Sequence, residues 1–385
     1  MSLSKKIVPH LLNRARISVA ESEPADIIVH DSSFYRDVLM KCSLGLGDSY
    51  IEGKWDSANI DEVIFRILSS GIYQKVEFVY DLFREMKSRA VNLQNREGST
   101  KVIKKHYDLP VEIYAAFLDP YFQYTCAFFE GTSDLKQAQI NKMDLICQKL
   151  ALKEGDRVMD VGGGWGGLAK FMADNYVVKP VVVTLSNEQA NYIRETHGEK
   201  IEVWLCDYRD IPIRLVEQFD AVSAVGVLEH IGHKNYRTFM EIISQSLKNG
   251  GRFLLHTLYT LSSRPEQNPW VDKHIFPNSE LPPIGFIRSS TQSFFKTVTG
   301  SQGFQELTSH YNPTLIAWNN NLNHAIESGD VKMPEMMHRK FQYYFLSYAG
   351  AFQAEHLRVG QFLYEKNLST IRKHPSYSDK KQERY

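Results

Sequence analysis

Along the middle of the chain, short apolar runs typical of β-strands alternate with segments in which apolar residues recur at helical spacing. The strand-like runs occupy residues 157–161, 181–184, 202–206, 219–225 and 251–257. The segments with helical spacing occupy residues 137–152, 168–175, 187–197 and 236–247. This alternation predicts an α/β fold, in which a mostly parallel sheet carries helices on both faces.

The alternation stops after residue 257, where a stretch rich in proline and aromatic residues begins. Residues 258 to about 335 include segments such as Asn268-Pro269-Trp270, which suit neither a long helix nor a central strand. We expect this stretch to be a lid inserted into the domain. The regular pattern returns at 341–352 and 359–365, which we predict to be the last two strands.

The N-terminal part follows a different pattern and contains no nucleotide-binding loop. Helical spacing occurs at residues 60–68 and 76–86, and residues 43–47 have the composition of a turn. The polar stretch 92–100 has the composition of a linker. We therefore predict a small, mainly helical N-terminal domain at residues 1–90, a linker at 91–100 and a second domain at 101–385.

Composition narrows the choice of partner and compartment. The 385 residues suffice for about two domains, and 45 Lys and Arg residues balance 45 Asp and Glu residues. Because no net positive field results, a nucleic-acid partner is not expected. No apolar stretch reaches the roughly 20 residues that cross a bilayer, and the N-terminus lacks an apolar signal core. We expect a soluble, cytoplasmic protein.

The cysteines and histidines do not have the spacing of a metal site. Cys42, Cys126, Cys147 and Cys206 lie far apart, without a C-x-x-C pair or a repeated Cys/His spacing. Cysteines dispersed in this way are expected to be free thiols in a reducing compartment. We therefore predict no bound metal.

A glycine-dense turn follows the first predicted strand of the sheet, at Val158-Met-Asp-Val-Gly-Gly-Gly-Trp-Gly-Gly167. Gly162, Gly164 and Gly166 let the backbone approach a ligand at points where a Cβ atom would collide with it. The helix that begins there offers free backbone N–H groups to the same ligand. The turn therefore predicts a loop that binds a nucleotide-type cofactor.

The identity of this cofactor depends on the strands that follow. Gly162, Gly164 and Gly167 also satisfy the dinucleotide pattern G-x-G-x-x-G, which is a weak signal alone. A nicotinamide enzyme should carry an acidic residue at the end of the next strand, but this strand ends in Thr184-Leu185-Ser186. Asp160 before the glycines and Asp207 after a later strand suit the amino-acid and adenosine parts of S-adenosylmethionine (SAM). The pattern favours SAM over NAD.

Two polar motifs follow predicted strands, at the edge where open α/β sheets bind ligands. Glu229 and His230 follow strand 219–225, and His256 ends strand 251–257. Each also has an ordinary explanation, with Glu229 as a carboxylate at a helix start and His256 as a hydrogen-bonded histidine. Their coincidence with a cofactor loop favours a catalytic role.

Taken together, the motifs of this chain resemble those of the bacterial cyclopropane fatty acid synthase family. The matching segments are residues 24–27, 43–50, 106–109, 124–127, 158–167, 229–232, 255–257, 275–278, 311–318 and 349–352. They extend over nearly the whole chain, and the N-terminal matches resemble the phospholipid-modifying branch more than the shorter mycolic-acid branch. The resemblance implies the Rossmann-like sheet of a SAM-dependent methyltransferase.

The resemblance also implies a reaction, the transfer of a methylene group from SAM to the cis double bond of an unsaturated acyl chain in a membrane phospholipid. An alkene is a poor nucleophile, so such a site must exclude water and align the reacting groups. Electron-rich rings would stabilise the carbocation left after methyl transfer, which gives the aromatic run 121–129 a function. A packing role explains roughly half of these rings equally well. A base must then remove a proton to close the ring.

In this family the base is thought to be bicarbonate, and the resemblance places Cys126, Glu229, His256, Leu258 and Tyr311 around it. Leu258 would contribute through its backbone, whereas His256 and Tyr311 would donate hydrogen bonds. Glu229 would have to share a proton with the anion, which a pKa raised by burial permits. No neighbouring cation in the sequence activates Cys126, so we assign it a binding role only.

For SAM, the resemblance points to ten positions, to which Asp160 is added from the strand before the glycines. The ten are Tyr124, Thr125, Gly162, Gly164, Gly166, Thr184, Leu185, Gln189, Asp207 and Tyr208. The chain departs from the family at two places. Gly163 stands where relatives often carry Cys, which keeps the loop small. Pro110-Val111-Glu112 replaces the usual Gly-Asn type continuation after residues 106–109, so the resemblance does not extend to this part of the lid over SAM.

A soluble enzyme that acts on acyl chains must hold itself at the membrane surface. We expect the N-terminal domain and the cations Lys101, Lys104 and Lys105 to contact the inner face of the bacterial membrane peripherally, although a solvated linker explains these cations equally well. A homodimer is expected. Two alternatives stay open: a SAM-dependent methyltransferase of a lipid or small molecule that stops before ring closure, and a lipid-binding scaffold with an inactive cofactor loop.

Overall fold

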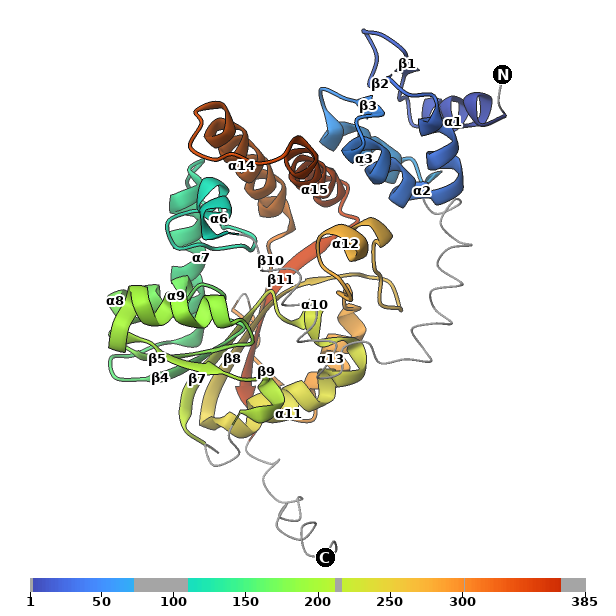
Figure 1. Cartoon of the computed structure of the whole chain (residues 1–385). Helices are drawn as coiled ribbons and strands as arrows, with labels where there is room; N and C mark the ends of the chain where they lie inside the picture. The colour runs from blue at the N-terminus through green and yellow to red at the C-terminus, as the bar shows by residue number, and fades with distance from the viewer. Residues whose placement is uncertain (1–2, 73–109, 212–216, 301, 368–385) are drawn as a thin grey trace, which may run out of the picture.

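The computed structural model describes residues 3–72, 110–211, 217–300 and 302–367 (Figure 1). Its centre is an eight-stranded sheet in the order β10-β11-β8-β7-β4-β5-β6, with β9 paired to β11. The strands are β4 Arg157–Val161, β5 Lys179–Thr184, β6 Glu202–Leu205, β7 Phe219–Val225, β8 Leu247–Tyr259, β9 Phe295–Thr297, β10 Phe304–Glu306 and β11 Arg358–Lys366. Strands β4 to β8 pair in parallel, and β11 is antiparallel to its three neighbours. The predicted mostly parallel sheet is confirmed.

Helices cover both faces of this sheet. They are α7 Leu135–Leu150, α8 Gly167–Tyr176 and α9 Asn187–His197 on one face, and α11 Tyr236–Ser246 and α13 Ile284–Thr291 on the other. On the first face, Met143 and Leu168 pack with Val158 and Leu254 of the sheet. On the second, Phe239 and Ile287 pack with Phe253. The predicted helices 137–152, 168–175, 187–197 and 236–247 match α7, α8, α9 and α11 closely.

A helical layer lies over the edge of the sheet where the parallel strands end (Figure 1). It consists of α6 Val111–Phe117, α12 Pro269–His274, α14 Thr308–Glu327 and α15 Glu335–Gln353. The prediction that residues 341–352 form a strand is wrong, because they lie in α15. Helix α15 is enclosed by α14, α3 and α2, so apolar residues are needed on nearly all of its sides and the helical period disappears from the sequence. The strand predicted at 359–365 is confirmed as β11.

Residues 258–335 contribute both to this helical layer and to the sheet. Strands β9 and β10 lie within this stretch and pair with β11. The stretch is therefore partly built into the sheet instead of interrupting it. Its action as a lid stays a prediction.

The N-terminal domain is mainly helical, with α1 Leu3–Arg14, α2 Ser33–Ile51 and α3 Ile60–Ser69. A three-stranded sheet in the order β1-β2-β3 joins them, with β1 Val19–Ala20, β2 Ile27–Val29 and β3 Trp55–Asp56. The turn predicted at residues 43–47 is wrong, because these residues continue α2 beyond a kink at Cys42. Gly45 and Gly47 serve close packing instead, since a Cβ on Gly47 would lie 2.4 Å from the Trp270 ring.

Some predicted features fall outside the described residues. They are the helix 76–86, the linker 91–100, the cations Lys101, Lys104 and Lys105, and the motif at 106–109.

The N-terminal domain packs directly on the helical layer of the second domain. Helices α2 and α3 lie against α15, and a Cβ on Gly350 would lie only 2.2 Å from the carbonyl oxygen of Asp61. Arg339 of α15 donates to the carbonyl oxygens of Tyr50 at 2.7 Å and Trp55 at 3.0 Å. Asp48 accepts from Lys273, which lies in α12, at 2.7 Å. This close fit makes the N-terminal helices part of the wall around the site described next.

Candidate functional site

A cavity of about 1180 Å³ opens where the parallel strands of the sheet end, beneath the helical layer. The predicted site residues that line it are Tyr124, Thr125, Cys126, Asp160, Gly162, Gly164, Thr184, Leu185, Gln189, Asp207, Tyr208, Glu229, His256, Leu258 and Tyr311. Gly166 does not line the cavity and is the N-cap of α8. The structure thus brings residues from positions 124 to 311 into one space.

The glycine loop between β4 and α8 forms one wall of the cavity. Gly162, Gly164 and Gly166 have φ angles of 70°, 56° and 81°, a region that side chains disfavour. A Cβ on Gly162 would lie 2.5 Å from Val227, whereas a Cβ on Gly164 would have no protein atom within 4 Å. Gly164 therefore faces open space, which suits a loop that cradles a cofactor.

Asp160 lies behind this loop, at the end of β4. Its Oδ1 accepts from the Ser223 hydroxyl at 2.7 Å, and burial raises its pKa to about 7. A Cβ on Gly163 would lie 2.7 Å from Asp160 Oδ2, so the departure from the family at this position leaves room for the carboxylate. Lys142 of α7 donates to the Thr125 hydroxyl at 2.8 Å, and burial lowers the pKa of Lys142 to about 8.

The ends of β5 and β6 supply the next polar groups. Thr184 donates to Gln189 Oε1 at 2.8 Å, so strand end and helix α9 hold each other in place. The Asp207 carboxylate accepts from both the backbone N–H and the side chain of Arg209 at 2.9 Å. The Arg209 guanidinium lies 4.6 Å from the centre of the Tyr208 ring. These contacts hold the side chains of Gln189 and Asp207, which line the cavity.

Glu229 lies in the short helix α10 Leu228–Ile231, which follows β7. Its Oε1 accepts from the Leu258 N–H at 2.6 Å, and its buried Oε2 has no hydrogen-bond partner among the described residues. Burial raises the pKa of Glu229, so its neutral form is favoured more than in water. Leu258, which is predicted to contribute through its backbone, thus already donates its N–H to Glu229.

His256, Tyr311 and Cys126 complete this polar end of the cavity. Burial lowers the pKa of His256 to about 3, so its imidazole is neutral, and its Nε2 has no partner among the described residues. Burial raises the pKa of Tyr311 and of the Cys126 thiol. The Cys126 thiol donates to the Ala127 carbonyl oxygen at 3.3 Å. The neutral O–H of Tyr311 and N–H of His256 are donors that can hold a small anion.

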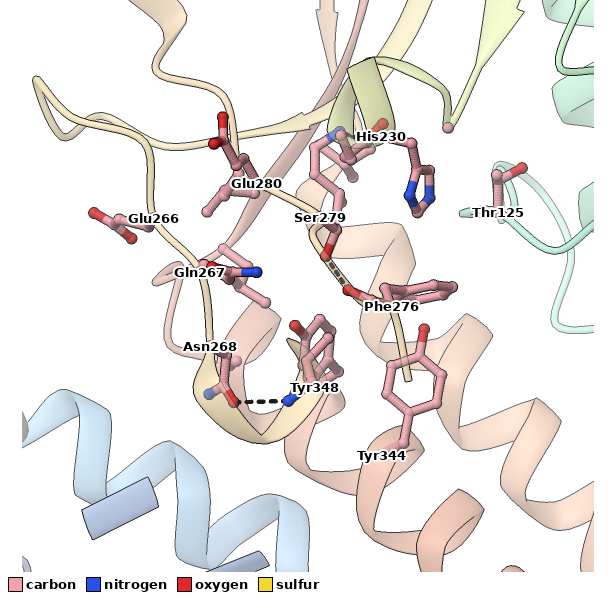
Figure 2. Close-up of a pocket in the computed structure, with 18 of the residues that line it drawn as sticks. Thr125, His230, Glu266, Gln267, Asn268, Phe276, Ser279, Glu280, Tyr344 and Tyr348 are labelled. Carbon is pink, nitrogen blue, oxygen red and sulfur yellow. Dashed lines mark hydrogen bonds between the residues drawn. The ribbon is translucent and has the colours of Figure 1, made fainter. Parts of the chain in front are cut away.

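Aromatic rings cover the cavity on the side of α15 and α12. Figure 2 shows the His230 imidazole, the Phe276 ring and the Tyr344 ring facing one space, with Thr125 beside it. The centres of the His230 and Phe276 rings are 5.6 Å apart. Tyr344 and Tyr348 lie four positions apart in the sequence and thus share one face of α15. The sequence pattern did not predict that either residue lines the site.

The apolar wall supplied by the N-terminal domain was also missed by the sequence analysis. Helices α1, α2 and α3 contribute Val8, Leu11, Leu12, Val38, Leu39, Leu46, Ile64, Ile67 and Leu68. Within α3, the spacing of Ile64, Ile67 and Leu68 already marks one apolar helix face in the sequence. The sequence does not tell whether this face covers a core or a ligand.

Comparisons with known proteins agree with this arrangement. A family model for mycolic acid cyclopropane synthetase matches residues 94–362. A cyclopropane-fatty-acyl-phospholipid synthase of Escherichia coli (strain K12) is 37% identical over 365 residues, which cover 94% of this chain and 94% of the relative.

Solved structures agree as well. The mycolic acid cyclopropane synthase CmaA1, solved with SAH and CTAB, is 28% identical and aligns with a TM-score of 0.62 over 69% of this chain and 98% of its own. Coclaurine N-methyltransferase, solved with SAH, aligns with a TM-score of 0.65 over 83% of this chain and 99% of its own, and at 18% identity it supports the fold alone. The predicted methyltransferase fold and the predicted family resemblance are both confirmed: the chain belongs to the mycolic acid cyclopropane synthetase family.

Proposed function

We propose that this protein transfers a methylene group from SAM to the cis double bond of unsaturated acyl chains in membrane phospholipids and closes a cyclopropane ring. The Escherichia coli relative, whose name states this type of substrate, aligns with nearly the whole chain. CmaA1, which is similar over a shorter part, was solved with SAH, the demethylated form of SAM. The Escherichia coli relative supports the class of substrate, and CmaA1 supports the cofactor.

The observation that carries this proposal is the continuity of the cavity. Gly164 and Asp207 lie at one end of it, and Leu39 and Ile67 of the N-terminal domain line another part. Its volume of about 1180 Å³ exceeds the roughly 300–1,000 Å³ of most small-molecule sites. A polar nucleoside and a long apolar chain would therefore both fit in one connected space.

The cofactor end fits SAM. Gly164 leaves space where a side chain would project, and Asp160 and Asp207 offer carboxylates to an ammonium group and to ribose hydroxyls. When bound, SAM supplies an electrophilic methyl group. The chain's own part is to orient the alkene and to exclude water, which the aromatic cover formed by Phe276 and Tyr344 supports.

Aromatic rings beside the cavity would also give the substrate cation a suitable environment. Methyl transfer to the alkene leaves a positive charge on the acyl chain, and aromatic faces attract a cation by about 0.5–2 kcal/mol each. The ring centres of Tyr124 and Trp318 lie 5.2 Å apart, and Phe276 lies 6.2 Å from Tyr124. We propose that Tyr124 and Phe276, which line the cavity, also line the path of the acyl chain, with the buried Trp318 packed against Tyr124.

Bicarbonate fits the polar end as the base. Glu229 Oε2 and His256 Nε2 are buried without partners among the described residues, so an additional polar group would satisfy both. Cys126 and Tyr311 stay protonated because burial raises their pKa values. The Tyr311 hydroxyl adds a donor, whereas the Cys126 thiol donates to the Ala127 carbonyl oxygen at 3.3 Å and would only contact the anion. Bicarbonate would supply a proton acceptor there, while a neutral Glu229 donates to it instead of repelling it.

The N-terminal domain is proposed to bind lipid and to contact the inner face of the membrane peripherally. Leu3 and Met40 are 71% and 74% exposed on α1 and α2, the helices that also line the cavity. Among the described residues, no helix is long and apolar enough to span a bilayer. We also propose that the protein is cytoplasmic and forms a homodimer. Sedimentation of the purified protein tests whether it is a dimer.

The activity is tested by incubating the protein with SAM and vesicles of unsaturated phospholipid. The expected product gains one CH₂ and loses its alkene, which proton NMR detects through the upfield signals of a cyclopropane ring. A methyl-branched alkene has the same mass, so the ring signals separate cyclopropanation from methyl transfer without ring closure. SAM binding without any lipid product would instead favour a binding protein.

A further inference from the structure

Three polar side chains form a buried row that leads from α7 to the cavity. Lys149 lies in the last turn of α7, Gln361 in β11 and His256 in β8, and each is at most 1% exposed. Gln361 and His256 are direct partners in the antiparallel pairing of β11 with β8. The next pair on the same face of these two strands, Leu363 with Leu254, is apolar. Of the three polar residues, only His256 lines the cavity.

The hydrogen bonds in this row have a direction. Lys149 Nζ lies 2.8 Å from Gln361 Oε1, and an ammonium group has only donors to offer. The amide oxygen must therefore face Lys149, and the amide NH₂ must face the other way. Gln361 Nε2 lies 3.4 Å from His256 Nδ1. Because the NH₂ group only donates, Nδ1 has to accept.

Burying the charge of Lys149 lowers the stability of the fold, so the presence of this residue calls for a functional explanation. Its surroundings lower the pKa of Lys149 to about 8 through burial alone, with no carboxylate contributing. The carbonyl end of α7 offers partial compensation for the positive charge. An apolar residue would fill the position more cheaply.

We propose that Lys149 and Gln361 are positioning residues that fix the tautomer of His256, so that Nδ1 is bare and Nε2 carries the proton. A neutral imidazole has one N–H group, and the bond made by one ring nitrogen decides which nitrogen holds it. Nε2 is the atom without a partner among the described residues, so the fixed proton is available to a ligand. That this ligand is the anionic base rests on the proposed function, whereas the tautomer itself does not.

The tautomer is measured by nitrogen NMR of the full-length protein with ¹⁵N-labelled histidine, using His256→Asn to assign the signals. We expect a bare Nδ1 and a protonated Nε2 in the wild type. Gln361→Glu keeps the shape of the side chain and a partner for Lys149 but presents only acceptors to His256. In this variant Nδ1 should become protonated.

Turnover should follow the tautomer. We expect Gln361→Glu to lower turnover about tenfold to a hundredfold, because it changes the group that orients His256, with SAM affinity changed less than about twofold. Gln361→Met removes both hydrogen bonds without imposing the opposite tautomer, so it should give a mixture of tautomers and a smaller loss.

Two results would overturn the proposal: a wild-type His256 with a bare Nε2, or a folded Gln361→Glu variant that keeps the wild-type tautomer. The wild-type spectrum decides even if the variants do not fold. A correct tautomer in a protein that makes no cyclopropane would overturn the proposed function alone.

Discussion

The two ends of the cavity are built in opposite ways. At the cofactor end, one wall is a continuous segment, the end of β4 and the glycine loop, in which the backbone itself forms the surface. The end proposed to hold the acyl chain, here called the lipid end, is made by side chains from α1, α2, α3 and α15, which extend from the first described helix to the last. One end therefore depends on local backbone conformation, and the other on the packing of two domains.

This difference decides how each end should respond to mutation. A backbone surface allows almost no side chain at its contact points, so a single substitution there can abolish binding. A wall of many apolar side chains shares its contribution among them, so each substitution has a graded effect. The predictions below use this contrast, from the largest effect to the smallest.

The largest effect is expected at the glycine loop. Gly164→Val would place a branched side chain in the open space of the cofactor end, at a φ of 56° that also strains the backbone by about 1–2 kcal/mol. We expect SAM binding to fall below detection in calorimetry. Gly155→Val is the matched control, because Gly155 has a φ of 84° and an equally open Cβ position but does not line the cavity. Similar losses of SAM affinity in both variants would assign the effect to strain instead of contact.

Glu229→Gln should separate cofactor binding from the later proton transfer. Gln can still accept from the Leu258 N–H, but it cannot exchange a proton with a ligand at Oε2. We expect turnover to fall at least about tenfold with SAM affinity nearly intact. Unchanged turnover would remove Glu229 from the mechanism.

A pH profile adds a second readout for Glu229. Burial raises its folded pKa above the usual value, so the neutral acid persists to higher pH than in water and is lost as pH rises through that folded pKa. If the neutral acid is the active form, wild-type turnover has a descending limb there. The Glu229→Gln profile should lack this limb, and its persistence would assign the limb to another group.

The same contrast explains what the sequence predicted. Strand–turn–helix order, the glycines and the residues after strand ends are local signals, so β4 to β8 were predicted, and most residues predicted to bind the cofactor line the cavity. Helix α15 was missed because its enclosed position removes the helical period, and Tyr344 and Tyr348 were missed with it. The lining role of Ile64 and Ile67 depends on the packing of two domains, which no local pattern encodes.

At the lipid end, the double variant Ile64→Asn, Ile67→Asn should lower activity on phospholipid vesicles about tenfold while SAM affinity stays unchanged. It places two polar groups on the cavity face of α3, where an acyl chain would leave them without partners. Glu62→Gln is the control on the same helix, because Glu62 pairs with Arg66 and does not line the cavity. A matching loss of SAM affinity would mean that the two ends of the cavity are not independent.

The smallest effect is expected for a single ring of the aromatic cover. Tyr344 lines the cavity beside Phe276 and His230 (Figure 2). Tyr344→Leu removes an electron-rich face worth about 0.5–2 kcal/mol to a nearby cation, so turnover should fall about threefold to tenfold. Tyr344→Phe keeps the face and should stay within about twofold of the wild type. Because several rings share the site, a loss in Tyr344→Leu as large as that of Glu229→Gln would contradict the graded behaviour of this end. Equal losses in Tyr344→Leu and Tyr344→Phe would show that the hydroxyl, and not the ring, matters.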